Sequence, residues 1–196
     1  MMANYVMRSG TQLKKFYKIM NPRIVNLAGH KVMVVGNAPI SIYPPPVSGY
    51  WNELVPEKEP KKVLILGFGA GTTARLINDK FPRAQIVGVD SSEEVLDLAR
   101  KEMDLDGIKA TVIVEDAFEY IKDCKQRFDL VIVDLWDGPV FNTLPLSPDF
   151  MDKCKKLLTA DGKILLNAPS LDVMAEAVGF NERTEIHTNS IYKYEN

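Results

Sequence analysis

The stretch that decides the fold is Lys62-Val-Leu-Ile-Leu-Gly67-Phe-Gly69-Ala-Gly71-Thr-Thr-Ala-Arg-Leu-Ile77. Its first residues form a short apolar run, the pattern of a strand buried in a parallel sheet. Gly67, Gly69 and Gly71 follow at alternate positions, and without a Cβ they let the backbone turn sharply and approach a ligand. A helical pattern then begins, with free N–H groups facing that ligand. The stretch therefore predicts a nucleotide-type cofactor site at a strand–helix junction.

The rest of the chain repeats this alternation of strand and helix. Besides the strand at 63–66, we expect strands at 85–89, 110–114, 130–133 and 163–166. The expected helices span residues 71–80, 92–103, 117–123, 148–158 and 171–178, and residues 183–194 are expected to form two short strands about a turn. Repeated strand–helix units predict an α/β fold with a mostly parallel sheet covered by helices on both faces. The final hairpin would add antiparallel pairing.

Residues 1–60 follow a different pattern. We expect a short helix over residues 11–20, a β-hairpin made by residues 32–35 and 40–43, and a short helix over 49–54. The chain then divides into an N-terminal extension, residues 1–60, and a cofactor-binding domain, residues 61–196. A two-stranded hairpin is marginal alone in water, so it must pack either onto this chain's own sheet or against a second copy in a homodimer.

The composition is that of an ordinary globular chain. Its 196 residues are 46% hydrophobic and carry a net charge of −2, so nothing draws the chain as a whole to nucleic acid or to an anionic membrane. We see no signal peptide and no apolar run of the ~20 residues that a membrane helix needs. Cys124 and Cys154 suggest no disulfide framework, and His30 and His187 lie in no metal-binding motif. We expect a cytoplasmic protein without a metal site.

An acidic residue ends the second strand of the repeating region. Asp90 lies 21 residues after Gly69, the distance at which a carboxylate reaches ribose hydroxyls in this type of fold. Asp90 could instead cap the following helix. Because Ser91 or Ser92 could provide that cap, the ribose role is favoured.

The third and fourth strands also end in acidic residues. Asp116 could bind an adenine amino group while Ala117 leaves room for the ring, and Asp116 could equally be a helix N-cap. Asp134 and Asp137 would lie at the reactive end of the cofactor, where they could hold a cationic amine or act as a general base. Asp137 could also simply serve the turn Asp137-Gly-Pro139.

The glycine loop alone leaves two cofactors open. Gly67-x-Gly69-x-Gly71 resembles an S-adenosylmethionine loop, whereas Gly69-Ala-Gly71-Thr-Thr-Ala74 also fits the dinucleotide form with alanine at the third position. The later segments favour the first cofactor. Five of them together resemble the class I S-adenosylmethionine-dependent methyltransferases, most closely the spermidine synthase-like branch: residues 64–72, 87–90, 115–120, 128–139 and 146–167.

The resemblance implies a Rossmann-like methyltransferase fold with a mostly parallel seven-stranded sheet, a C-terminal antiparallel hairpin and a short N-terminal β-hairpin extension. It implies S-adenosylmethionine as the cofactor, with the amino-acid part cradled by the three glycines. Asp90 would bind the ribose, Ser91 would be a further cofactor-binding residue, and Asp116 and Ala117 would contact the adenine.

The resemblance also implies catalytic roles. Asp134 corresponds to the aspartate that deprotonates the attacking amine. Asp137 corresponds to the second aspartate of a D-x-x-D-P pattern, although Gly138 precedes the proline here.

Two departures from the polyamine enzymes decide the expected activity. Ala70 stands where aminopropyltransferases have an aspartate, in a pattern like G-G-G-D-G-G, and their Tyr-His-Glu has at best Tyr50-Trp51-Asn52-Glu53 as its counterpart. We therefore expect a methyltransferase acting on a small-molecule acceptor, without a nucleic-acid or membrane partner. An aminopropyltransferase using decarboxylated S-adenosylmethionine is the alternative. A non-catalytic subunit that binds the cofactor or a partner is the second alternative, motivated by N- and C-terminal regions shorter than those of the polyamine enzymes.

Overall fold

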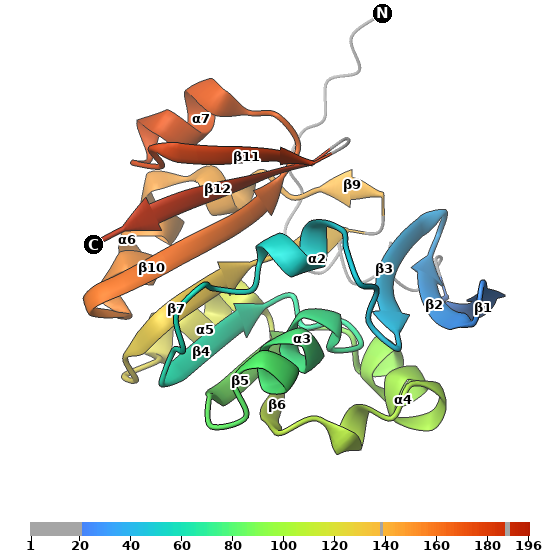
Figure 1. The fold of residues 1–196 in the computed structure, drawn as a ribbon. Helices are drawn as coiled ribbons and strands as arrows, with labels where there is room; N and C mark the ends of the chain where they lie inside the picture. Colours follow the sequence, from blue (N-terminus) through green and yellow to red (C-terminus); the bar gives the residue numbers. More distant parts are fainter. Residues whose placement is uncertain (1–20, 138, 187–188) are drawn as a thin grey trace, which may run out of the picture.

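The computed structural model describes residues 21–137, 139–186 and 189–196, and the helix expected over residues 11–20 lies outside them. The main sheet has seven strands in the order β11-β12-β10-β7-β4-β5-β6. These strands are β4 (Lys62–Leu66), β5 (Gln85–Asp90), β6 (Ala110–Val114), β7 (Phe128–Val133), β10 (Leu158–Ala168), β11 (Glu182–Ile186) and β12 (Asn189–Glu195). The five from β4 to β10 run parallel, whereas β12 is antiparallel to both β10 and β11. The predicted α/β class, with a terminal antiparallel hairpin, is confirmed (Figure 1).

The order of the strands in the main sheet indicates where a ligand would bind. The chain leaves β4 toward β5 and β6 on one side and then returns to β7 on the other side of β4. Such a reversal opens a crevice at the carboxyl ends of the two central strands, where open α/β sheets bind ligands. Gly67 and Asp134 directly follow these two strands.

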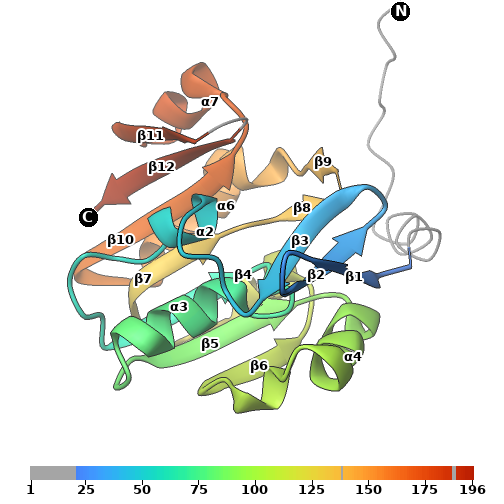
Figure 2. The ribbon, with the colours of Figure 1, turned by 45° about the vertical axis from the view of Figure 1, so that its right-hand side comes forward.

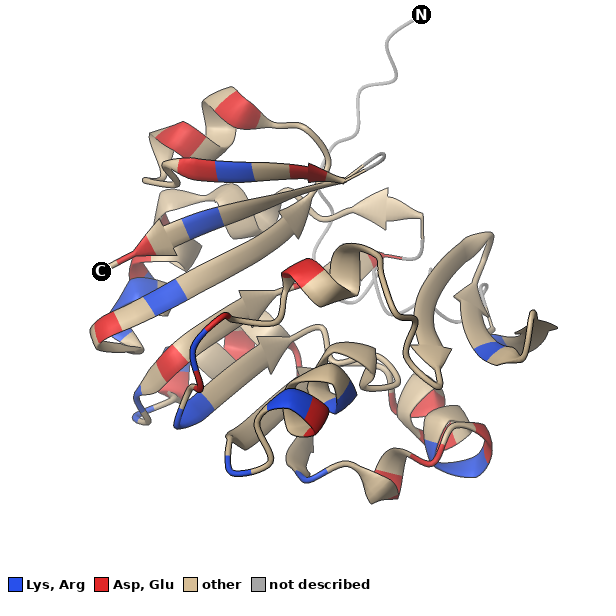
Figure 3. Cartoon of the chain, in the orientation of Figure 1, with Lys and Arg blue, Asp and Glu red and all other residues tan. Residues whose placement is uncertain are grey.

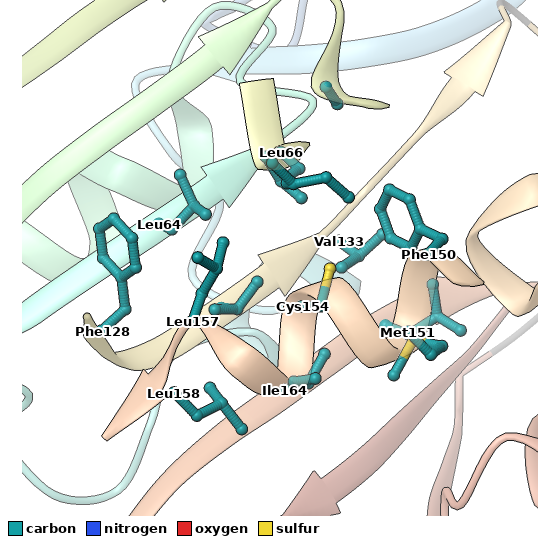
Figure 4. Packing of buried hydrophobic residues seen from close by; sticks show 14 of the residues in the cluster. Leu64, Leu66, Phe128, Val133, Phe150, Met151, Cys154, Leu157, Leu158 and Ile164 are labelled. Carbon is teal, nitrogen blue, oxygen red and sulfur yellow. The ribbon is translucent and has the colours of Figure 1, made fainter. Parts of the chain in front are cut away.

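Helices cover both faces of the sheet because neighbouring strand residues point to opposite sides. Leu64 and Leu66 face a core that also contains Phe150 and Cys154 (Figure 4). Val63 and the other odd-numbered residues of β4 face a second core. The helices are α2 (Tyr50–Glu53), α3 (Thr72–Lys80), α4 (Glu93–Glu102), α5 (Ala117–Asp123), α6 (Pro148–Lys156) and α7 (Asp172–Ala177). No described helix has the length and apolar character needed to cross a membrane.

The N-terminal strands form a separate small sheet with one strand more than expected. Besides β2 (His30–Val35) and β3 (Ala38–Tyr43), the structure has β1 (Arg23–Leu27), which pairs antiparallel with β2. β1 was not predicted from the sequence. Most of its residues are exposed, so β1 lacks the alternation of buried apolar and exposed polar residues that marks a strand. Figure 1 and Figure 2 both show this sheet on the side toward which β4 and β5 point.

Hydrogen bonds attach the small sheet to the glycine loop. The Ser41 Oγ accepts from the backbone N–H of Ala70 at 2.8 Å, and the Ile42 N–H donates to the Thr72 Oγ1 at 2.8 Å. The hairpin therefore packs onto its own chain, one of the two arrangements expected for it. The homodimer and the division between residues 60 and 61 stay predictions.

The segment after β7 lies between the expected strand at 130–133 and the expected helix at 148–158, and it has regular structure of its own. It contains two short paired strands, β8 (Trp136–Asp137) and β9 (Val140–Phe141), and the 3-10 turn η2 (Leu144–Leu146). The Trp136 and Phe141 rings pack edge to face with centroids 5.2 Å apart, a favourable arrangement for an aromatic pair. This contact joins the two short strands and shapes one wall of the site.

Candidate active site

A pocket of about 470 Å³ opens at the carboxyl ends of the central strands. Its walls come from the glycine loop, the turn between β2 and β3, the start of α5, the β8–β9 segment and the ends of β10 and β11. Eight of the nine residues predicted for the site line it: Gly67, Gly69, Asp90, Ser91, Asp116, Ala117, Asp134 and Asp137. The structure therefore brings together, from four separate strand ends, residues that the sequence spreads over 71 positions, from 67 to 137.

Two of the glycines are needed for close approach of other parts of the chain. Gly67 has φ +86°, and a Cβ there would lie 2.1 Å from the carbonyl oxygen of Asp134. Gly71, the remaining predicted residue, precedes α3, where a Cβ would lie 2.2 Å from the Ile108 Cδ1. Gly71 thus packs behind the loop and is not among the pocket residues, so its contact with a cofactor stays a prediction.

Asp90 holds the glycine loop in place. Its Oδ2 accepts from the Gly69 N–H at 2.7 Å and its Oδ1 from the Ser92 N–H at 2.9 Å. The cap of α4 is Ser92, whose Oγ accepts from the Val95 N–H at 3.2 Å. Burial raises the pKa of Asp90, and the backbone hydrogen bonds partly offset that rise. A carboxylate has about four lone-pair sites, so Asp90 retains capacity to accept ribose hydroxyls.

Asp116 is a helix N-cap, one of the two roles considered for it, and its contact with adenine stays a prediction. Its Oδ1 accepts from the Phe118 N–H at 2.8 Å and the Glu119 N–H at 3.3 Å, so it is the N-cap of α5. Asp116 also lines the pocket, next to the buried Ala117. Capping therefore fixes this carboxylate at the pocket wall.

Asp134 is a buried acid of the site whose pKa is raised. Burial raises its pKa to about 6, and the negative charge of Asp90 adds to the rise. Hydrogen bonding from Asn167, whose Nδ2 donates to the Asp134 Oδ1 at 2.8 Å, and from Trp136 acts in the opposite direction. A carboxylate with a pKa near neutrality is suited to exchange a proton with a bound substrate.

Sequence reasoning missed several polar residues of the pocket. Tyr50 lies near Asp134, and burial followed by the Asp134 charge raises the pKa of its hydroxyl well above the ordinary value. Asn167 and Asn189 also line the pocket. Asn167 directly follows the apolar run Ile164–Leu166, as Asp134 follows β7, so a polar residue at a strand end was the signal that could have found it.

The charged residues in the described lining of the pocket are all acidic. Four carboxylates line it, from Asp90, Asp116, Asp134 and Asp137, and its described lining contains no Lys, Arg or His. Elsewhere in the described chain, basic and acidic residues are interspersed over strands and helices (Figure 3). The local excess of negative charge favours a positively charged ligand.

Comparisons with known proteins point to one family. The family model "Spermine/spermidine synthase domain" matches residues 53–192. The polyamine aminopropyltransferase of Chromobacterium violaceum is 30% identical over 119 residues, which are 60% of this chain and 44% of that protein. The chain spans about half the length of the curated relatives it matches.

Solved structures share the fold at low sequence identity. Spermidine synthase from Thermotoga maritima superposes with a TM-score of 0.67 at 17% identity, covering 90% of this chain and 73% of that one. Human methyltransferase-like protein 13, in complex with SAH, gives a TM-score of 0.60 at 22% identity, covering 72% of this chain and 74% of that one. Both kinds of enzyme are built on this fold, so the fold does not distinguish between them.

The expectation of a methyltransferase is wrong, because the curated relatives are named polyamine aminopropyltransferases and the matching family is theirs. The expectation depended on Ala70 as a missing carboxylate in the site. The structure buries Ala70, which is 1% exposed, in the core cluster that also contains Phe68 and Met33, and Ala70 is not among the residues that line the pocket. The identity of residue 70 therefore says little about the charge that a ligand meets here.

Proposed function

Because the chain belongs to the spermine/spermidine synthase domain family, we propose that it is a transferase that moves an aminopropyl group from decarboxylated S-adenosylmethionine to a small amine. The observation that carries the proposal is the carboxylate-lined pocket, with no cationic side chain in its described lining. Decarboxylated S-adenosylmethionine has a sulfonium and an ammonium but no carboxylate, so all its charge is positive. The amine acceptor is also cationic in water, and both would be attracted by this pocket.

The residues present fit such a ligand. Asp90 and Ser91 would bind the ribose, and Asp116 with Ala117 would contact the adenine. Gly67 and Gly69 would allow the ligand to approach the backbone. A bulkier residue at position 67 would meet the Asp134 carbonyl oxygen, so this cradle depends on glycine.

Asp134 would act as the general base. When bound, the decarboxylated cofactor supplies an electrophilic carbon beside a positively charged sulfur. The amine nitrogen would bond to this carbon while the carbon–sulfur bond breaks and methylthioadenosine leaves. Asp134 would take the proton that the amine nitrogen loses, and its pKa of about 6 leaves most of it ionised at pH 7. Asp137, on β8, would hold the charged end of the acceptor. Positioning the two partners in the pocket supplies much of the rate enhancement in such transfers.

The test is a transfer assay on the purified chain. Decarboxylated S-adenosylmethionine and putrescine are incubated with the protein, and spermidine and methylthioadenosine are quantified by mass spectrometry. We expect both products in equal amounts, and a loss of about 10²–10⁴-fold in kcat for Asp134→Asn, the usual contribution of a general base.

Two outcomes would contradict the proposal. Tight binding of methylthioadenosine with no product from putrescine or other small amines would favour the non-catalytic alternative. An Asp134→Asn variant that retains full activity would remove Asp134 from the proposed chemistry.

A further inference from the structure

Two asparagines connect Asp134 to strand β12 of the main sheet. The Asn189 Nδ2 donates to the Asn167 Oδ1 at 3.0 Å, and the Asn167 Nδ2 donates to the Asp134 Oδ1 at 2.8 Å. The three residues come from three neighbouring strands, because Asp134 follows β7, Asn167 is in β10 and Asn189 begins β12. They form a directional chain of hydrogen bonds that ends on the carboxylate.

The register of the sheet fixes this chain. Val133 of β7 pairs with Leu166 of β10, so the next residues, Asp134 and Asn167, lie side by side at the end of β7. On the other side, Ala168 pairs with Ser190 of β12, which brings Asn189 to the same edge. A shift of register by one residue would turn Asn167 to the other face and break the contact.

The donor from Asn189 determines which end of the Asn167 amide faces Asp134. An asparagine side chain has an acceptor oxygen and a donor nitrogen. With its oxygen held by Asn189, Asn167 presents its N–H to the carboxylate. Flipping the amide would set the carbonyl oxygen against Asp134 and the two amide nitrogens against each other. Because Asn167 is only 1% exposed, water would not compensate for these lost hydrogen bonds.

The other ionisable groups around Asp134 oppose its ionisation or do not assist it. Asp90 faces it from β5 and carries the same charge, and Tyr50 faces it from α2 as a neutral phenol. Asp137, on β8, also lines the pocket. The hydrogen bonds from Asn167 and Trp136 are the interactions that favour the ionised form, and that from Asn167 is the one anchored in the sheet.

We infer that Asn167, oriented by Asn189, is the positioning residue that keeps Asp134 ionised and aimed into the pocket for proton transfer. The inference rests on the proposed function for its catalytic meaning. The hydrogen-bond chain itself is testable without turnover.

The experiment compares the wild type with Asn167→Leu, Asn189→Ala and a control, Asn26→Ala. Asn26 is an exposed residue of β1, remote from the chain of hydrogen bonds. The pKa of Asp134 is measured by titration of its carboxyl ¹³C resonance in the intact protein. A hydrogen bond to a charged group is worth about one pH unit. We therefore expect the pKa of Asp134 to rise by about that amount in Asn167→Leu, by less in Asn189→Ala, and not at all in Asn26→Ala.

The pH profile of transfer gives a second readout. In Asn167→Leu, kcat/KM should fall roughly tenfold below pH 6 and by less than about twofold at pH 9, because the lost ionisation is restored by alkali. A purely structural role would lower kcat/KM equally at every pH. If Asn167→Leu does not fold, Asn189→Ala tests the same expected rise in the pKa of Asp134. It removes the donor that orients Asn167 and places no apolar residue in the core.

The outcomes separate the two proposals. An unchanged pKa of Asp134 in both variants would overturn the inference, even if the wild type makes spermidine. A raised pKa together with an inactive wild type would support the hydrogen-bond chain and refute the proposed function.

Discussion

Replacing Gly67 with alanine tests the claim that the site depends on close contact between the ends of β4 and β7. The new Cβ would lie 2.1 Å from the carbonyl oxygen and 2.8 Å from the carbonyl carbon of Asp134. These are backbone atoms, so no side-chain rotation relieves the clash. The position also has φ +86°, a left-handed conformation unfavourable for residues with a Cβ.

The two effects give the expected magnitude. The left-handed backbone destabilises alanine by about 1–2 kcal/mol, and forced overpacking adds about 1–3 kcal/mol. Gly67→Ala should therefore lower the free energy of unfolding by about 2–5 kcal/mol. For a chain of this size each kcal/mol shifts Tm by about 2–4 °C, so Tm should fall by about 4–20 °C.

Gly29→Ala is the matched control. Gly29 has φ +83°, but a Cβ there has no atom within 4 Å, so only the backbone effect of about 1–2 kcal/mol applies. Both variants are unfolded in urea, and the difference between their free energies of unfolding gives the contribution of the clash. If Gly67→Ala is no more destabilising than Gly29→Ala, the contact between Gly67 and Asp134 does not constrain the site and the reasoning is refuted. The clash should also displace Asp134, so Gly67→Ala, unlike Gly29→Ala, should lose transfer activity at temperatures where it remains folded.

Three further predictions concern other parts of the molecule. The pKa of Asp134 is raised to about 6 from 3.8, so its ionisation destabilises the folded state as the pH rises from about 4 to 6. Asp134→Asn should therefore raise the free energy of unfolding by up to about 3 kcal/mol at pH 8 and leave it nearly unchanged below pH 4, and a variant less stable than the wild type at pH 8 in urea unfolding would contradict this. Asp90→Ala removes the acceptor of the Gly69 and Ser92 N–H groups and should weaken methylthioadenosine binding by about tenfold or more, whereas unchanged calorimetric affinity would exclude Asp90 from the ligand site. Leu66→Ala, at a fully buried position, should lower the free energy of unfolding by about 2–5 kcal/mol, while Val173→Ala, at a position 82% exposed, should change it by less than about 0.5 kcal/mol; equal effects would contradict the assigned packing.

Some of the site was predictable because parallel strands end at a common edge. Asp90 and Asp134 were found because each follows a buried apolar run, and such residues meet at the crevice. Asn167 also follows a buried apolar run. However, asparagine is neither an acid nor a base, so its residue type alone does not indicate a role in the site. The role of Asn167 depends on the hydrogen bond from Asn189, which belongs to an antiparallel strand near the end of the chain.

Ala70 shows the converse error, a residue that was expected at the ligand site and does not line the pocket. A residue between two glycines of a ligand-binding loop was expected to meet the ligand, and its methyl group was interpreted as evidence against an aminopropyltransferase. The direction of its side chain depends on the turn of the loop and on the small sheet that hydrogen-bonds to its N–H through Ser41. Neither is encoded in the local pattern.

The sequence by itself determined the order of strands and helices, the glycine loop and the acidic strand ends, because these follow from local periodicity and from the few residues that tolerate a sharp turn. The tertiary structure decided which residues reach the pocket and how they behave there. The pKa of Asp134 depends on burial and on its neighbours Asp90, Asn167 and Trp136. Asp90 ends β5 and Asn167 lies in β10, whereas Asp134 and Trp136 lie in the segment after β7. Interactions of this kind exist only once the strands are paired in register.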